Sequence, residues 1–374
     1  MLRIATFLIL AIAGLAVVPV INARDRMADP ARTVPWHQGF IPWQEGFDAY
    51  NLEFALPLYS RMVAPFGISI SPEQAVIGKR GWLYLGDQYA EIISRKRAGG
   101  LADDDAMAAA TLDSHARWRD WLMAQGVRDY RVLLGPNKST WYPQYLPEWV
   151  ARGGGRGDGR GGNQRILDLP GADAIFVDGA RTFDGQELVP GAELYFRTDT
   201  HWNTLAGVLA AQTLLRSVEG VPVKLPRVSQ PQHYDRQGGD LANFLRLQTV
   251  LRDTDYAFTY GGGPVDTTRI RFDTGAIEGS GGNPHIDSQT TPLLVSNPTA
   301  ANDLKVLWLR DSFGTALSPY MAAAFSNLMQ VHFDKAYAGT GEMLKTLVAE
   351  WQPDLVLVTV VERSVLYPVW GTGP

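Results

Sequence analysis

The stretch Lys305-Val-Leu-Trp-Leu-Arg-Asp311-Ser312-Phe-Gly314-Thr315 decides the fold class that the sequence predicts. An apolar run ends here in Asp-Ser-Phe-Gly and leads directly into a helical stretch, residues 315–327. A serine in such a strand-to-helix turn lies at the carboxyl edge of a sheet, where amide groups at the helix start can stabilise an oxyanion. Ser312 is therefore a candidate nucleophile, although Asp311 or Ser312 could instead serve only as a helix N-cap.

A second motif, Tyr195-Phe-Arg197-Thr-Asp199-Thr-His201-Trp202-Asn203, offers the base that a serine nucleophile needs. Asp199 and His201 are two residues apart, so in an extended segment both side chains point to the same side. The carboxylate can then hold one imidazole nitrogen while the other nitrogen faces the serine. Alone, the pair could be a structural histidine bonded to a carboxylate. Together with the Ser312 turn, it favours a triad of Ser312, His201 and Asp199.

Outward from these motifs, short apolar runs alternate with helical stretches. The apolar runs cover residues 128–134, 174–177, 305–309, 328–333 and 354–361, and the helical stretches cover residues 103–125, 204–218 and 315–327. This alternation predicts an α/β fold in which helices cover both faces of a parallel sheet.

The residues that precede this domain in the sequence indicate that the protein is exported from the cytoplasm. Residues 4–21 are apolar except for Thr6, Gly14 and Pro19, and they follow Arg3. The length of the segment 1–23 fits both a cleaved signal peptide and a retained anchor, and we expect the anchor, with Arg3 in the cytoplasm. Residues 24–75 predict an extended arm. Residues 76–374 predict the folded domain, with an exposed Gly-rich loop at 152–163 and a surface insertion around 261–284.

Composition excludes several classes of protein. The 374 residues carry a formal net charge of −5 and contain no cysteine. A basic surplus for nucleic-acid phosphates is lacking, and disulfides, thiolate metal sites and cysteine nucleophiles are ruled out. The six histidines never form a His-x-x-x-His pair, and the chain has no Gly-x-Gly-x-x-Gly or Walker loop, so we expect neither a metal nor a nucleotide cofactor.

From about residue 75 onward, the chain resembles the SGNH-hydrolase-like O-acetyltransferases of bacterial polysaccharide modification, the AlgJ/AlgX-type proteins of alginate and cellulose acetylation. The specific part of the resemblance is the pair Asp-Thr-His-Trp and Asp-Ser-Phe-Gly, in that order. Three further segments support it: Gly78-Lys-Arg-Gly81-Trp82-Leu-Tyr84, Gly135-Pro136-Asn137-Lys138-Ser-Thr-Trp-Tyr142-Pro143 and Val361-Glu362-Arg363-Ser364.

The resemblance implies an α/β/α sandwich with a circularly permuted motif order. Ordinary SGNH hydrolases place the serine first, whereas Asp199 here precedes Ser312 by 312 − 199 = 113 residues. It also implies a periplasmic, inner-membrane-anchored enzyme that moves an acetyl group through a Ser312 acyl-enzyme onto hydroxyls of an exopolysaccharide. The implied partners are this acceptor, a membrane-bound O-acyltransferase that supplies the acetyl group, and other subunits of a polysaccharide secretion complex.

In ordinary members the last strand ends in the asparagine of the oxyanion hole, and here Glu362-Arg363 stands in that place. The amide of Ser312 is the first candidate donor, with Arg363 and Tyr337 as further candidates. Candidate substrate contacts are Trp202, Lys138, Asn137 and Arg197.

We expect cellulose rather than alginate as the acceptor. The net charge is acidic, and four tryptophans lie in or beside the motifs and could stack on pyranose rings, namely Trp82, Trp141, Trp202 and Trp308. Two alternatives stay open: a periplasmic acetylesterase with the same triad, and a non-catalytic polysaccharide-binding scaffold subunit.

Overall fold

The computed structural model describes residue 17 and residues 55–152, 158–183, 188–261, 264–371 and 373–374. The chain forms two compact units, Met1–Ile68 and Ser69–Pro374. Apart from Val17, the predicted export segment lies outside the described residues, as does most of the predicted arm, so both stay predictions. Within the described ranges, every helix is too short or too polar to cross a bilayer.

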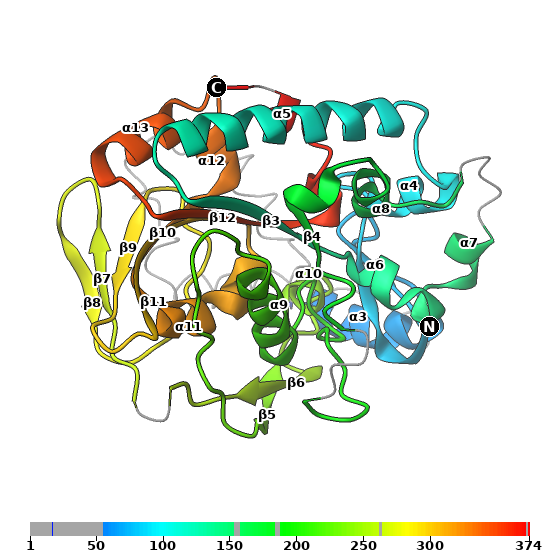
Figure 1. Cartoon of the computed structure of the whole chain (residues 1–374). Helices are drawn as coiled ribbons and strands as arrows, with labels where there is room; N and C mark the ends of the chain where they lie inside the picture. Colours follow the sequence, from blue (N-terminus) through cyan, green and yellow to red (C-terminus); the bar gives the residue numbers. More distant parts are fainter. Residues whose placement is uncertain (1–16, 18–54, 153–157, 184–187, 262–263, 372) are drawn as a thin grey trace, which may run out of the picture. The chain divides into compact units, whose positions relative to one another are not determined.

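An eight-stranded sheet organises the second unit (Figure 1), in the order β4-β3-β12-β10-β11-β9-β7-β8. Five neighbouring strands run parallel: β4 (Phe176–Asp178), β3 (Asp129–Gly135), β12 (Leu355–Val361), β10 (Asn302–Arg310) and β11 (Phe325–His332). They coincide with the five apolar runs, which confirms the predicted parallel sheet.

Three antiparallel strands, which the sequence pattern did not indicate, extend the sheet. They are β9 (Leu293–Ser296), β7 (Thr268–Arg271) and β8 (Ile277–Ser280). Each is four residues long, and β7 and β8 have no buried residue, so neither shows an apolar run. The segment 261–284, predicted as a surface insertion, thus contributes a hairpin to the edge of the sheet.

Helices cover both faces of the parallel strands (Figure 1). On one face lie α5 (Asp104–Ala124), α12 (Phe333–Tyr337) and α13 (Glu342–Trp351), and on the other lie α9 (Thr204–Arg216) and α11 (Gly314–Ala324). The three predicted helices are confirmed. The last one ends earlier than expected, at Ala324, because Phe325 already has extended backbone and begins β11.

The core explains why the central strands are mainly apolar. Alternate residues of a strand point to opposite faces. In β10, Leu307 and Leu309 therefore belong to the core that α5 and α13 also line, whereas Trp308 and Arg310 point to the other face. A parallel strand that is covered on both faces needs apolar residues on both, and every residue of β3 and β12 is buried.

The remaining elements are short. The helices are α3 (Leu56–Val63), α4 (Ile92–Ala98), α6 (Lys138–Trp141), α7 (Glu148–Ala151), α8 (Gly162–Leu167) and α10 (Asp240–Phe244). Two-stranded antiparallel sheets pair β1 (Ala75–Ile77) with β2 (Leu83–Leu85), and β5 (Gln232–Gln237) with β6 (Arg252–Ala257).

The Gly-rich segment 152–163 differs in part from the exposed loop that was predicted. Residues 153–157 lie outside the described ranges, and Asp158 and Gly159 are exposed. Gly161, however, packs so closely on Glu362 that a Cβ atom at this position would lie 1.8 Å from Glu362 Oε1. Because glycine lacks a side chain, the backbone here can pack closely on the domain. The glycines therefore allow close packing as well as conformational freedom.

Candidate active site

Ser312 lies in the turn that leads from the carboxyl end of β10 into α11. The carboxylate of Asp311 holds this turn. Its Oδ1 accepts a hydrogen bond from the amide of Phe313 (2.9 Å), and its Oδ2 accepts one from the amide of Val361 (2.8 Å), at the end of β12. Asp311 therefore joins two neighbouring strand ends and presents Ser312.

Arg310, next to Asp311, also stabilises this turn. Its buried guanidinium donates hydrogen bonds to the side chain of Gln330 (2.8 Å) and to the carbonyls of Ile286 (2.6 Å) and Asp287 (2.8 Å). The side chain leaves no room beside it, because a Cβ atom on Gly314 would lie 2.1 Å from Arg310 Cδ. The glycine of Asp-Ser-Phe-Gly is thus explained by close packing.

The segment that carries Asp199 and His201 is held by a buried lysine. The ammonium of Lys138 donates to the carbonyls of Phe196 (3.0 Å), Arg197 (3.2 Å) and Asp199 (2.6 Å). At the end of the segment, Asn203 caps α9, since its side chain accepts a hydrogen bond from Ala206 N (3.1 Å). Both ends of the motif are therefore anchored.

The structure brings Ser312, His201 and Asp199 into one continuous hydrogen-bonded chain. His201 Nδ1 lies 2.7 Å from Asp199 Oδ1, and His201 Nε2 lies 2.8 Å from Ser312 Oγ. The side chain of Asp199 is 10% exposed and that of His201 is 27% exposed. This arrangement places a base next to the serine and a shielded carboxylate behind the base, as serine acyl transfer requires.

The electrostatics of the site stabilise the charged form of the His201 imidazole. Burial by itself lowers the pKa of His201, but the hydrogen bond and charge of Asp199 and the charge of Asp240 outweigh it, so the net shift is upward. For Asp199, burial raises the pKa, yet hydrogen bonds from His201 and the charges of His201 and Arg236 hold the pKa of this carboxyl well below its usual range. Asp199 is thus ionised throughout the neutral range.

Two residues that the sequence analysis did not indicate stand beside this chain. Asp240 Oδ2 lies 3.9 Å from His201 Nδ1, and Asp240 Oδ1 accepts from the amide of Thr200 (2.7 Å). Arg236 Nη2 lies 3.4 Å from Asp199 Oδ2. Neither belongs to a recognisable motif. The Gly-Gly pair before Asp240 was the local sequence signal for a turn at which the backbone packs closely on another segment.

The carboxylates of Asp199 and Asp240 and the imidazole of His201 also offer ligand atoms within 4.8 Å of one another, as a metal ion would need. Both nitrogens of His201, however, are already engaged, with Asp199 and with Ser312. A cation bound here would take the base away from the serine. The arrangement fits acyl transfer better than metal binding.

A cleft of about 550 Å³ opens over the triad. Its other wall comes from β5, with Tyr234 and Arg236, and from residues 285–288, with His285, Asp287 and Ser288. Four carboxylates line the cleft (Asp199, Asp240, Asp255 and Asp287), against one guanidinium (Arg236). The cleft is therefore acidic and large enough for a sugar unit with its neighbours.

The amides at the start of α11 are not equally free. Phe313 N donates to Asp311 Oδ1, and Gly314 N donates to the carbonyl of Asp311 (3.2 Å). The amide of Ser312 has no acceptor among the described residues. Arg363 lies close by, with its guanidinium carbon 5.3 Å from the centroid of the Phe313 ring.

Tyr337 lies elsewhere and cannot be an oxyanion donor. It is fully buried at the end of α12, in the core beneath α5, and its hydroxyl lies 2.6 Å from that of Tyr130. Tyr130 in turn contacts His115 Nδ1 (2.6 Å). The side chain of Tyr337 thus points into the helical layer and away from Ser312.

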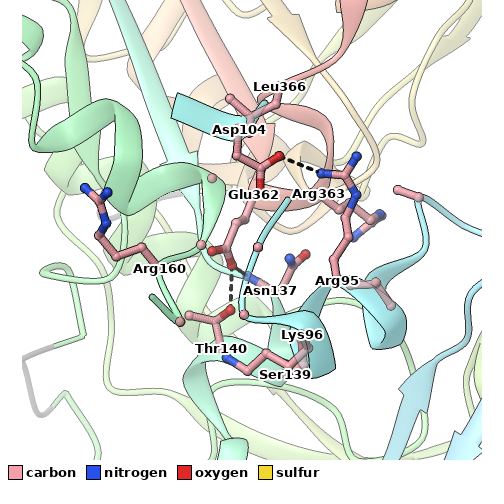
Figure 2. Close-up of a pocket in the computed structure, with 17 residues that line it drawn as sticks. Arg95, Lys96, Asp104, Asn137, Ser139, Thr140, Arg160, Glu362, Arg363 and Leu366 are labelled. Atoms are coloured by element: carbon pink, nitrogen blue, oxygen red, sulfur yellow. Dashed lines mark hydrogen bonds and ion pairs between the residues drawn. The ribbon is translucent and has the colours of Figure 1, made fainter. Parts of the chain in front are cut away.

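The candidate substrate contacts are mostly structural. Trp202 is fully buried, and its Nε1 donates to the carbonyl of Phe313 (2.8 Å), so its ring cannot stack on a sugar. Lys138 holds main-chain carbonyls, as described above. Arg197 pairs with Glu193 (Nε to Oε2, 2.9 Å) and does not line the cleft. Asn137 is buried and lines a separate cavity (Figure 2).

Of the tryptophans in the other motif segments, Trp82 and Trp308 are core residues and Trp141 is half-buried. Trp82 and Trp308 are 1% and 0% exposed, and Trp141 packs edge-on against Phe183, with ring centroids 5.1 Å apart. Aromatic stacking by these four residues therefore gives no support to a choice of acceptor.

This fold and this serine, histidine and aspartate geometry define an SGNH-hydrolase-like α/β protein. Residues 75–260 match the family model described as SGNH hydrolase-like domain, acetyltransferase AlgX, and this half of the chain belongs to that family. The family resemblance seen in the motifs is thereby confirmed. The matched segment contains Asp199, His201 and Asp240 and ends before Ser312.

Solved structures of Bacillus cereus PatB1 share the fold at low sequence identity. Bacillus cereus PatB1 has a TM-score of 0.53 at 14% identity, over 78% of this chain and 97% of that chain. The structure of PatB1 with a sulfonyl adduct has a TM-score of 0.54 at 14% identity, over 80% of this chain and 97% of that chain. The O-acetyltransferase domain of Pseudomonas putida AlgJ has a TM-score of 0.46 at 17% identity, over 79% of this chain and 92% of that chain. No curated protein matches the chain in sequence.

Proposed function

We propose that the protein is an O-acetyltransferase that moves an acetyl group through a Ser312 acyl-enzyme onto a hydroxyl of a secreted polysaccharide. The observation that supports this most directly is the chain of hydrogen bonds from Asp199 through His201 to Ser312, with distances of 2.7 and 2.8 Å. A histidine with only a structural role would not need its second nitrogen on a serine hydroxyl in an open cleft.

In the first step, His201 Nε2 takes the proton of Ser312 while Oγ attacks the acetyl carbonyl carbon. The bond from this carbon to the donor's leaving oxygen breaks, and His201 returns the proton to that oxygen. In the second step, the acceptor hydroxyl gives its proton to His201 and attacks the acetyl carbon. The bond to Ser312 Oγ breaks, and the proton goes back to Ser312.

The oxyanion of each tetrahedral intermediate needs donors near Ser312. The amide of Ser312 is the first candidate because it has no other acceptor in the part of the chain that the structure describes. Arg363 is the second candidate, since its guanidinium lies over Phe313, next to the nucleophile. Asp199 and Asp240 stabilise the imidazolium that forms in both steps.

For the acceptor, we propose a neutral polysaccharide such as cellulose rather than a polyuronate. The support is the excess of carboxylates in the cleft, which would repel an anionic chain over a Debye length of about 8 Å at physiological salt. Family resemblance supports the rest of the picture: a circularly permuted motif order, a periplasmic location with residues 1–23 as an inner-membrane anchor, a membrane-bound O-acyltransferase as supplier, and other subunits of a secretion complex.

The test is acetyl trapping on a pseudo-donor ester, read by intact mass and by mapping of the modified residue. Acetyl should appear on Ser312 in the wild type and be absent in Ser312→Ala. Ser288→Ala is the matched control, because Ser288 lines the same cleft without a hydrogen-bonded histidine, and it should be labelled like the wild type. A sulfonyl fluoride is a second probe, as PatB1 carries a sulfonyl adduct in one structure. Labelling of folded Ser312→Ala by either reagent would contradict the proposal.

An acetylesterase with the same triad is the alternative, favoured by the openness of the cleft to water. Comparing acetyl transfer to oligosaccharides with release of free acetate separates the two. A protein that is never acetylated and still binds oligosaccharide would instead be a scaffold subunit.

A further inference from the structure

A second cavity, of about 80 Å³, opens at the same carboxyl edge of the sheet (Figure 2). Its walls come from Asn137, just after β3, from Glu362 and Arg363, just after β12, and from α4 and the glycines at 159–162. None of the triad residues lines it. Among the residues that line it, the reaction proposed above uses only Arg363, as a candidate oxyanion donor.

The charges of this cavity are opposite to those of the cleft. It is lined by four basic side chains (Arg95, Lys96, Arg160 and Arg363) and two acidic ones (Asp104 and Glu362), a balance of 4 − 2 = +2. The cleft over the triad has one guanidinium and four carboxylates, a balance of 1 − 4 = −3 with histidines neutral. Two cavities of opposite charge favour two different ligands.

Part of the positive charge in the cavity has no internal partner. Arg95 pairs with Asp104 (3.0 Å), and Arg160 pairs with Asp158 (2.7 Å). By contrast, neither Lys96 nor Arg363 forms an ion pair with any described carboxylate. Burial lowers the pKa of Arg363, and the charges of Asp311 and Asp240, which lie beyond ion-pair distance, offset only part of this effect.

Glu362, the buried acid in the cavity wall, does not supply a counter-charge to Lys96 or Arg363. Glu362 is buried, and its Oε2 accepts from the amide of Asn137 (2.9 Å) and from the hydroxyl of Thr140 (2.7 Å), as Figure 2 shows for Thr140. The side chain of Asn137 is 7% exposed, and its Oδ1 has no hydrogen-bond partner within the described ranges. Asn137 thus adds a polar side chain to the charged lining of the cavity.

Arg363 connects the cavity to the chemistry. Its guanidinium carbon lies 5.3 Å from the centroid of the Phe313 ring, and Phe313 is the residue after the nucleophile. Arg363 therefore both lines the cavity and contacts the residue next to the nucleophile.

We propose that this cavity holds an anionic group, a carboxylate or a phosphate, on the leaving group of the acetyl donor, while the acidic cleft receives the acceptor. The inference rests on the proposed function. When the bond between the acetyl carbon and the leaving oxygen breaks, the proton from His201 goes to that oxygen, and the released group stays bound by its charge until it leaves. The donor and the acceptor thus approach Ser312 from hollows of opposite sign.

The experiment compares two acetate esters of the same shape, 4-acetoxybenzoate, which is anionic, and 4-acetoxybenzamide, which is neutral. In Lys96→Gln, the ratio of kcat/KM for the anionic ester to that for the neutral ester should fall about three- to tenfold, as expected for one lost charge near a partly screened anion. Arg97→Gln is the matched control. Arg97 is on the same helix, but its guanidinium lies over Trp149 and does not line the cavity. This control should leave the ratio unchanged.

Binding gives a second measurement that needs no turnover. Calorimetric titration with 4-hydroxybenzoate should show several-fold weaker binding to Lys96→Gln than to the wild type or to Arg97→Gln, and the difference should shrink at high salt. Equal losses for both esters, or the same effect in Arg97→Gln, would overturn the proposal. So would a dependence on Lys96 that follows the charge of the acceptor oligosaccharide instead of the ester. If the neutral ester still requires Ser312 in any of these cases, the proposed acetyl transfer stands and only the cavity's role fails.

Discussion

Asp240 Oδ2 lies 3.9 Å from His201 Nδ1, on the same nitrogen that Asp199 Oδ1 contacts at 2.7 Å. The imidazole therefore faces two carboxylates, one in direct hydrogen-bond contact and one that acts through its charge. Burial and the charge of Asp199 raise the pKa of Asp240, so the two acids influence each other as well as the base.

The first prediction concerns the pH dependence of acetylesterase activity. His201 must be neutral to take a proton, and its pKa is raised, so kcat/KM should decline as the pH falls through that raised value. In Asp240→Asn, a charge that stabilises the imidazolium is lost, the pKa of His201 drops, and the acidic limb should move to lower pH. The charge of Arg363 acts in the opposite direction and is unchanged in this variant.

Asn can replace Asp240 without disturbing the loop, because its Oδ1 can still accept from the amides of Thr200 and Leu241 (2.7 Å each). The pH profile of kcat/KM on a neutral aryl acetate checks the prediction. An unmoved or alkaline-shifted limb would mean that Asp240 does not act on His201.

A second prediction is that Asp199→Asn lowers kcat by about 10³-fold while KM changes little, since the carboxylate holds the imidazole tautomer and stabilises the imidazolium. Asp240 can take over part of this charge stabilisation. The double variant with Asp240→Asn should therefore lose more activity than the single one. Steady-state kinetics on the same ester is the measurement. A loss expressed mainly in KM would make Asp199 a binding residue.

The third prediction is that Lys138→Met damages the site through its support. Burial lowers the pKa of Lys138 to about 8, and its ammonium serves three carbonyls of the Asp199 segment. Leaving these buried acceptors without a donor should cost about 1–3 kcal/mol of unfolding free energy and reduce kcat. Lys305→Met is the control, because Lys305 Nζ donates to the carbonyl of Trp351 (3.2 Å), near the amino end of β10. The control should keep kcat, and denaturant unfolding together with kinetics would show whether it does.

The features that could be predicted from the sequence are those that local sequence patterns determine. The five parallel strands are short apolar runs because helices cover both of their faces, and Asp199 and His201 converge because they are two residues apart in an extended segment. The turn at Ser312 follows from a strand that ends in Asp-Ser-Phe-Gly. These features depend on neighbours in sequence.

What the sequence missed depends on tertiary contact. Asp240 and Arg236 reach the triad because α10 and β5 pack against it. The Gly-Gly pair before Asp240 indicates only a close turn, and nothing near Arg236 marks it. Trp202 and Tyr337 stand beside motif or strand-end positions, yet their side chains point into the core, a direction that proximity in sequence does not specify. The antiparallel strands β7 and β8 carry no apolar run, since they form an exposed edge.

The last prediction is that cello-oligosaccharides accept acetyl better than mannuronate oligomers, for an electrostatic and not an aromatic reason. Asp240, Asp255 and Asp287 line the cleft with Asp199, and only Arg236 opposes them. Salt should therefore raise transfer to mannuronate by screening the repulsion and leave transfer to cello-oligosaccharides nearly unchanged. Asp287→Asn should reduce the preference for cello-oligosaccharides. Asp287 is exposed, and its link to the site is a main-chain carbonyl that accepts from Arg310, which the variant keeps. Transfer rates for both acceptors at low and high salt decide the matter. A preference for mannuronate that weakens as salt rises would show that basic groups, and not these carboxylates, select the acceptor.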